Sequence, residues 1–428
     1  MGGEGVTRQE RGEGAGGELA PDGAPPPGAA KAGAGTAPAG AAVPQALAAP
    51  ATSAHRIRGP GGASGDEPMP RVLLSRRQIL AFGIFVLSCV GFLYFVLPNL
   101  AGVDSTVHHI AHGDRWWIVI GVLLEALSFG GYVVLFRTVL VRGQPRVGWG
   151  ESYQITMAGL AATRLFAAAG AGGVALTAWA LRRAGMEPRT VASRMLAFFV
   201  LLYVVYAGSL VIDGVGLGSG LFPGGGSFAI TIVPAIVATV LFAIAGLMML
   251  IPGDIERRLG ARAHGSGRRA RWLARAVTVP ALASSGMRMA IGLVREREIG
   301  VLGAVAWWGF DMSVLWAMFH AFGSPPPFTV IWMAYFVGTL GNLLPLPGGL
   351  GGVEGGMIGA FAAFGVSLEL AVVAVLSYRA ISFWLPTFPG GLAYLQLRRT
   401  VSRWRQEEGE SRAAGVLAAE PARALQGS

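Results

Sequence analysis

The chain has 428 residues, of which 53% are hydrophobic and only 14% are charged. Soluble domains carry about 25% charged residues, so this composition excludes an ordinary soluble fold and predicts an all-α polytopic membrane protein. The formal net charge is +10, and almost all of the positive charge is arginine. In a chain this apolar, we expect the basic excess to face the cytoplasm and anionic lipid rather than nucleic acid.

Both ends of the chain differ from its apolar middle. Residues 1–68 are rich in Gly, Ala and Pro and lack apolar periodicity, which predicts a disordered tail without a signal peptide. Residues 401–428 are polar, and we expect a second disordered tail there. The membrane domain is predicted to occupy residues 71–400, between these tails.

Six apolar runs are long enough to cross a hydrocarbon core about 30 Å thick. Arginines at alternate ends of these runs predict that both termini are cytoplasmic, in what we expect to be a bacterial plasma membrane. The predicted spans are residues 79–98, 116–140, 190–212, 228–251, 299–322 and 369–386.

Two further segments are apolar but interrupted. In residues 151–184 and again in 329–364, two pieces of about 16 and 12 residues flank a Gly-rich break, and each piece is too short to cross alone. We predict two re-entrant helix pairs. Because three crossings separate them, the pairs enter from opposite sides, which is the plan of an inverted repeat in secondary transporters.

The longest basic segment is residues 252–298, which we interpret as the main cytoplasmic loop. Its second half, residues 276–298, is predicted to form an amphipathic helix at the membrane interface. The loop is also where a partner enzyme would dock if the protein served as a scaffold.

Ionisable side chains inside predicted spans are costly to insert and are functional candidates by default. We expect Arg379 and Arg164 to offer positive charge to an anionic head group, while Glu354 and Asp311 hold them or relay protons. The alternative is a set of buried ion pairs that fix helix register, and for Glu125 we favour this structural role.

The break within Gly338–Gly365 offers a second kind of site. Proline and glycine at Pro345, Pro347, Gly348, Gly349 and Gly351 free backbone amides that could hold an anion at a helix N-terminus. Asn342 lies at the entrance to this break and is a further candidate. The alternative is close helix packing through small residues at four-residue spacing. The glycines with such spacing are Gly348, Gly351, Gly352, Gly355 and Gly359.

Other chemistry finds little support. His108, His109 and His112 have metal-ligand spacing on a helix, but a solvated outer loop is the favoured interpretation. The single cysteine, Cys89, excludes a disulfide framework and a cysteine-based metal site. No phosphate-binding loop or hydrolase motif is present, so we expect neither catalysis nor a cofactor.

From about Gly300 onward the sequence resembles the lysylphosphatidylglycerol synthase transmembrane-region family, also called flippase-like or UPF0104 membrane proteins. The motif Pro-x-Pro-Gly-Gly-x-Gly-x-x-Glu ending at Glu354 carries this resemblance, together with Tyr378-Arg379, Pro386 and Gly390. In the first interrupted segment, Arg164 and an Ala/Gly run stand where the family pattern would place Asn and Pro. The resemblance implies a domain that handles lipid. In relatives this domain stands beside a soluble synthase domain, which this sequence does not contain.

These observations favour translocation of an anionic phospholipid or lipid-linked precursor between leaflets. An alternative is a proton-coupled secondary transporter of a small anionic solute, with Asp311 or Glu354 as the proton site. A third is a scaffold that holds a separate synthase or glycosyltransferase through the basic loop. The resemblance adds Tyr378 to the candidate lipid-binding residues.

Overall fold

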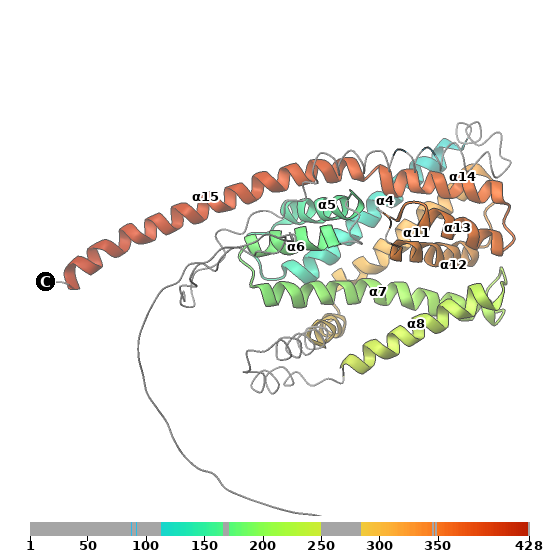
Figure 1. Ribbon diagram of the computed structural model, residues 1–428, viewed down its shortest axis with the longest axis horizontal. Coiled ribbons are helices and arrows are strands. Elements are labelled where there is room, and N and C mark those ends of the chain that lie inside the picture. The colour runs from blue at the N-terminus through green and yellow to red at the C-terminus, as the bar shows by residue number, and fades with distance from the viewer. Residues whose placement is uncertain are drawn as a thin grey trace, which may run out of the picture. The chain divides into compact units, whose positions relative to one another are not determined.

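A computed structural model describes residues 87, 91, 113–165, 171–249, 284–344, 346 and 349–426. Within these ranges every regular element is a helix, as the composition predicts (Figure 1). Several predictions lie outside the described residues: the tail 1–68, the histidines of the loop 99–115, and most of the first span. Only Leu87 and Gly91 of that span are described, and both are helical.

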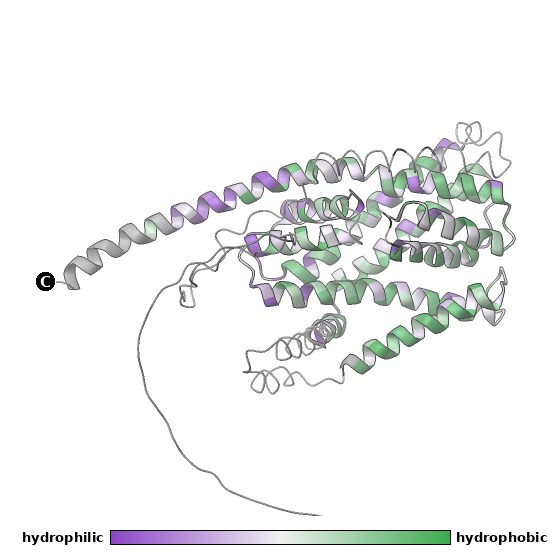
Figure 2. Cartoon of the chain, in the orientation of Figure 1, coloured by the Kyte–Doolittle hydropathy of each residue, from purple (hydrophilic) through white to green (hydrophobic). Residues whose placement is uncertain are grey.

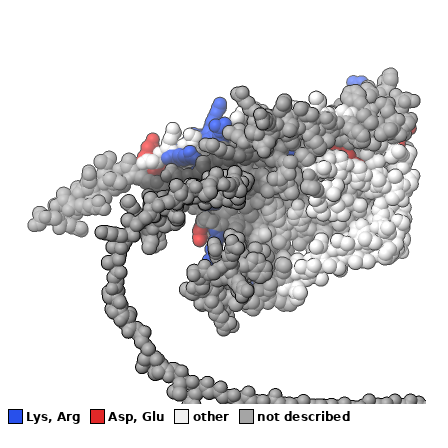
Figure 3. Space-filling view, in the orientation of Figure 1, with Lys and Arg blue, Asp and Glu red and all other residues white. Residues whose placement is uncertain are grey.

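Five helices are long and apolar enough to cross a membrane, and they confirm five of the predicted spans. These helices are α4 (Arg115–Phe136) with the π-helical turn η2 (Arg137–Val141), α7 (Pro188–Gly218), α8 (Phe228–Met249), α11 (Gly303–Phe322) preceded by η3 (Ile299–Leu302), and α14 (Leu368–Arg379) with its continuation. In Figure 2 their ribbons are mostly in the green and white of hydrophobic and intermediate residues. In Figure 3 the described surface in view is almost free of charge over a wide area on the right.

The last span is longer than predicted. After α14 the chain makes a π-helical turn, η6 (Ala380–Trp384), and then forms α15 (Thr387–Gln426). The expectation of a disordered tail is therefore wrong for residues 401–426. Arg, Glu, Gln and Ala dominate this segment and are good helix formers, and Arg146 pairs with Glu408 at 2.9 Å.

Both interrupted segments form pairs of short helices. The first consists of α5 (Trp149–Leu165) and α6 (Ala171–Arg183), and the second of α12 (Phe328–Thr339), the 3₁₀ turn η4 (Leu340–Leu343) and α13 (Gly352–Ala363). In each pair the two helices pack against one another. At about 1.5 Å per residue none of the four spans a hydrocarbon core by itself.

Helices α4 and α11 form the central contact of the fold. They approach closely because Gly131 and Gly303 face each other, and a Cβ atom on either would meet backbone atoms of the other helix. One hydrophobic core lies mainly among α11, α12, α13 and α14, and includes Phe319, Tyr335 and Phe361. A second lies mainly among α4, α5, α6 and α7. The polar site described below is assembled from both halves.

The described end of the basic loop also adopts structure. Residues 284–295 are helical, and this segment docks on α7, where Ser285 and Ser193 share a hydrogen bond of 2.7 Å. Just beyond it, Glu296 and Glu298 pair with exposed Arg142 at 2.9 and 3.0 Å. The hydrogen bond to Glu296 and the charge of Glu298 raise the pKa of Arg142 above its ordinary value.

Candidate functional site

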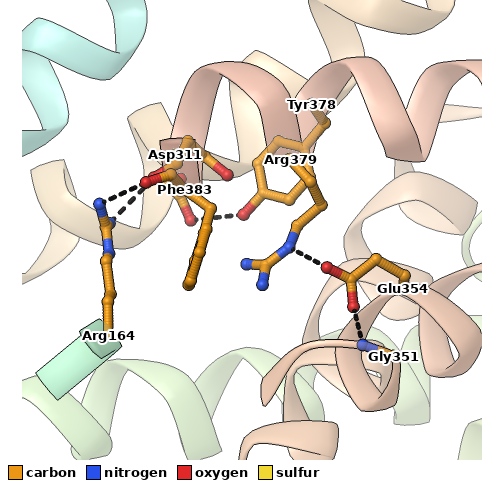
Figure 4. A network of polar contacts seen from close by, with 8 residues as sticks. Arg164, Asp311, Gly351, Glu354, Tyr378, Arg379 and Phe383 are labelled. Carbon is orange, nitrogen blue, oxygen red and sulfur yellow. Dashed lines mark hydrogen bonds and ion pairs between the residues drawn. The ribbon is translucent and has the colours of Figure 1, made fainter. Parts of the chain in front are cut away.

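The five ionisable residues predicted from the sequence all lie in one cluster inside the helical bundle. Figure 4 shows Arg164, Asp311, Glu354 and Arg379 of this cluster. They come from five different helices: Glu125 from α4, Arg164 from α5, Asp311 from α11, Glu354 from α13 and Arg379 from α14. Tyr335 of α12 and Tyr378 of α14 complete the polar contacts. The cluster therefore depends on the packing of the whole domain rather than on one segment.

Arg379 and Glu354 form a buried ion pair. The Nε–H of Arg379 donates to Oε1 of Glu354 over 2.6 Å, and the two residues are 8% and 1% exposed. The other carboxylate oxygen accepts the backbone N–H of Gly351 at 2.7 Å. Glu354 lies in the first turn of α13, where a negative charge is favoured by the helix dipole. The two side chains expected to interact are therefore in contact, and the role of Glu354 in orienting Arg379 stays a prediction.

Arg164 is held by backbone rather than by a carboxylate. Its Nη1 donates to the carbonyl of Phe383 at 3.0 Å, and its Nη2 donates to the carbonyl of Ser382 at 2.9 Å. These carbonyls lie in the π-helical turn η6. Pro386 has no N–H, so the Ser382 carbonyl lacks the donor that a regular helix would supply. Arg164 takes the place of that donor.

The ring of Phe383 lies between the two arginines, as Figure 4 shows. The guanidinium carbon is 4.5 Å from the ring centre for Arg379 and 5.4 Å for Arg164. A cation above an aromatic face is attracted by the ring quadrupole, and more strongly when it is removed from water. Phe383 thus stabilises two like charges close together inside the bundle.

Two further carboxyl groups, those of Asp311 and Glu125, act on the charge of Arg164. Asp311 accepts hydrogen bonds from the hydroxyl groups of Tyr335 and Tyr378, the second at 3.0 Å. Glu125 is 3% exposed, and the charge of Asp311 acts on its carboxyl group. Its Oε2 atom has no hydrogen-bond partner among the described residues. Glu125 was expected to fix helix register, and that role stays a prediction.

The cluster is unevenly enclosed. Glu125, Glu354, Tyr335 and Arg379 are buried, whereas Arg164 and Asp311 keep part of their surface exposed. Access from the surroundings is therefore on the side of Arg164 and Asp311.

The glycine-rich break is less open than predicted. The N–H of Gly349 donates to the carbonyl of Leu346 at 3.1 Å, and that of Gly351 is bonded to Glu354. Two of the amides expected to hold an anion, those of Gly349 and Gly351, are therefore engaged within the protein. Asn342 is exposed, with its side chain beside Gly349. The remaining break residues of the prediction, Pro345, Pro347 and Gly348, lie outside the described residues.

Close packing in this region follows a different glycine pattern from the predicted one. Gly338 of α12 meets Gly356 of α13, and Gly341 meets Gly352, so the helices approach at two glycine pairs. The packing role predicted for Gly352 is confirmed. For Gly351, Gly355 and Gly359 no such packing is found among the described residues, because a Cβ atom there would meet none of them within 4 Å. The face a glycine takes depends on helix rotation, which spacing alone leaves open.

Asp213 is a buried acid that the sequence prediction missed. The predicted span ended at residue 212 because glycines follow, but α7 continues to Gly218 and buries Asp213 completely. Neither carboxylate oxygen of Asp213 has a hydrogen-bond partner within the described part of the chain. Tyr335 and Phe383 were also missed, since aromatic residues in apolar runs carry no distinguishing signal. Among the residues described, no group of His, Cys, Asp or Glu could hold a metal ion.

Replacing Asp213 by asparagine is expected to stabilise the protein. An unpaired buried polar group costs about 1–3 kcal/mol, and more when it is charged. The amide keeps the shape of the side chain and removes the charge. Thermal unfolding in detergent should show a higher midpoint for Asp213→Asn than for wild type. A lower midpoint would mean that the carboxylate has a stabilising partner.

The amino-acid sequence of the chain is similar to those of known proteins. The family described as lysylphosphatidylglycerol synthase TM region matches residues 78–390. A UPF0104 membrane protein of Methanothermobacter thermautotrophicus is 25% identical over 309 residues, covering 68% of this chain and 88% of the relative. Another match to a UPF0104 membrane protein of this organism is 35% identical over 104 residues, covering 23% of this chain and 30% of the relative, which is under two thirds of its length. The family match covers well over half of the chain and confirms the resemblance to this family that the sequence motifs indicated. The chain is therefore an integral membrane protein that belongs to the lysylphosphatidylglycerol synthase TM region family.

Proposed function

We propose that this protein moves an anionic phospholipid or lipid-linked precursor between the two leaflets. The observation that carries the proposal is the pair of guanidinium groups of Arg164 and Arg379 on either side of Phe383. Arginine binds phosphate with paired hydrogen bonds, and it is retained inside membrane helices chiefly where it has a function. Burying two such groups together supports a site for an anionic head group.

The proposed architecture is an inverted repeat. Each half contains a long helix, two short helices and another long helical stretch, in the order α4, α5, α6, α7 and again α11, α12, α13, α14 with its continuation. We propose that the short pairs are re-entrant and enter from opposite sides, with both termini in the cytoplasm of a bacterial cell. The arginines Arg182 and Arg183 at the end of α6 support a cytoplasmic opening for the first pair.

In this mechanism the head group travels through the partly exposed side of the cluster while the acyl chains stay in lipid. Arg164 reaches the head group first, because part of its surface is exposed, and Arg379 then receives it deeper in the bundle. Glu354 accepts the Nε–H of Arg379 and so fixes the direction of the guanidinium group. Phe383 keeps both cations at a constant separation during the passage.

A leaflet-exchange assay in proteoliposomes tests the proposal. Fluorescent phosphatidylglycerol should exchange faster than fluorescent phosphatidylcholine with wild-type protein. In Arg164→Gln we expect the exchange of phosphatidylglycerol to fall by at least about tenfold, since one buried charge-assisted contact contributes roughly 1.5–3 kcal/mol. Arg142→Gln is the matched control, because Arg142 is exposed and distant from the cluster, and it should exchange lipid like wild type. The proposal would be refuted if phosphatidylglycerol and phosphatidylcholine exchanged at the same rate in wild type, and if Arg164→Gln showed that same rate for both lipids.

A second candidate is proton-coupled transport of a small anionic solute. The presence of Glu125 and Asp311 in the same cluster as the two arginines favours it, because acids next to a bound anion can exchange protons with it. It predicts a proton flux that depends on solute, which a lipid scramblase lacks. We expect no enzymatic activity of the chain itself. Docking of a partner synthase or glycosyltransferase on residues 252–298 stays a prediction.

A further inference from the structure

We propose that Asp213 of α7 is a proton-binding site, and that its carboxyl group holds a proton in the resting protein. The inference rests on the burial and the surroundings of this residue, and only its consequence for transport depends on the proposed function. Asp213 is 0% exposed, and neither of its carboxyl oxygens has a hydrogen-bond partner within the described ranges. An ionised carboxylate removed from water needs a partner, whereas a neutral carboxylic acid can be buried at a far smaller cost.

The described elements beside Asp213 contribute no positive charge. The next residue, Gly214, approaches both α8 and α12, and an added Cβ atom there would meet atoms of each. In their sequences, α8 and the loop 219–227 that follows α7 contain no ionisable residue. The ionisable residue of α12 is Tyr335, and its hydroxyl group donates to Asp311. A counter-charge for Asp213 is therefore missing from these three neighbours.

The ionisable groups of the other helices beside α7 lie elsewhere. In α11, Asp311 is itself an acid, and His320 stacks on aromatic rings of α4 and α11. Arg194 of α7 is about 28 Å along the helix from Asp213, at 1.5 Å per residue. The π-helical turn η2 and residues 284–295 dock at that same distant end, which the arginines of α6 directly precede in the chain. Within the described part of the chain, a bound proton is thus what neutralises Asp213.

Holding this proton links the stability of the protein to pH. Aspartate in an unfolded chain is ionised above about pH 4, so wild type at neutral pH takes up a proton when it folds. The free energy of unfolding therefore falls as the pH rises, until the folded protein itself releases the proton. Asp213→Asn neither buries a charge nor takes up a proton, so its stability advantage over wild type should grow from mildly acidic to neutral pH. In thermal unfolding in detergent, an advantage that stays constant or shrinks as the pH rises would contradict the proposal.

Infrared spectroscopy of the full-length protein in lipid nanodiscs tests the proton directly. At neutral pH we expect wild type to show the carbonyl stretch of a protonated carboxyl group that is absent from Asp213→Asn and that deuterium exchange shifts downward. Glu369→Gln is the matched control, because Glu369 is an exposed acid on α14 and its replacement should leave this band in place. If Asp213→Asn removes only the bands of an ionised carboxylate, the proposal is overturned. Neither measurement requires lipid to move, so the proton site and the proposed function can fail separately.

Helix α12 connects Asp213 to the arginine cluster. Met333 of α12 lies against Gly214. Two residues later, Tyr335 donates to Asp311 of the cluster. Loss of the proton leaves a charge that needs water, and we expect this to loosen the packing of α7 on α12 at Met333. The proton on Asp213 therefore favours the closely packed arrangement of the two helices.

The transport consequence rests on the proposed function and has its own readout. In proteoliposomes, the exchange of phosphatidylglycerol by wild type should change several-fold between mildly acidic and mildly alkaline pH. In Asp213→Asn this dependence should be lost, since the amide cannot release a proton. Identical pH profiles in the two proteins would overturn the coupling. No exchange by wild type at any pH would overturn the proposed function, while the infrared band would still decide whether Asp213 holds a proton.

Discussion

Arg379→Met is expected to abolish the exchange of anionic lipid and to destabilise the protein by about 3–5 kcal/mol. Methionine fills most of the volume but leaves the carboxylate of Glu354 buried, with the hydrogen bond from Gly351 as its described partner. The cation that would receive the head group is removed at the same time. Leaflet exchange in proteoliposomes and thermal unfolding in detergent measure the two effects separately.

The double variant Arg379→Met with Glu354→Gln separates function from structure. Glutamine removes the stranded charge and can still accept the N–H of Gly351, so most of the lost stability should return. Lipid exchange should remain absent, because the guanidinium is still missing. Recovery of both stability and exchange in the double variant would show that the ion pair only fixes helix register.

Gly338→Ala is expected to disrupt the packing of α12 on α13, at a cost of about 1–3 kcal/mol or more. The added Cβ atom would lie 2.7 Å from the backbone nitrogen and 2.8 Å from the Cα atom of Met357. Backbone atoms cannot turn aside as a side chain can, so one helix must move. Glu354 lies on α13, and a shift of α13 should lengthen the hydrogen bond between Glu354 and Arg379. We expect both the midpoint of thermal unfolding and the rate of lipid exchange to fall.

Gly355→Ala is the matched control on α13. It lies one residue before Gly356 and is exposed, and its added Cβ would meet nothing within 4 Å. Alanine also favours a helix over glycine by about 1 kcal/mol, so this variant should be as stable as wild type or more stable. Equal stability of Gly338→Ala and Gly355→Ala would contradict the close approach of the two helices.

The errors of the sequence-based prediction show where its information ends. Asp213 was assigned to a loop because glycines follow it, but α7 continues and buries it, since neighbouring helices stabilise those glycines in helical form. The tail beyond residue 400 was expected to be disordered because it is polar, but polar residues can be strong helix formers. Local composition decides neither whether Asp213 lies in a helix nor whether the tail is ordered, because both depend on which elements pack beside the segment.

The sequence by itself determined the class of protein, its family, five membrane spans and the ionisable residues of the cluster. A bilayer has a fixed thickness and excludes charge, so run length and isolated ionisable residues are informative without any contacts. Only the tertiary structure decided their partners. Arg379 bonds to a residue 25 positions away, whereas Arg164 bonds to a carbonyl 218 positions away that a π-helical turn and a proline leave without a donor. The burial of Glu125 in the cluster likewise depends on how α4 rotates against α11, and the periodicity of an almost uniformly apolar helix leaves that rotation undefined.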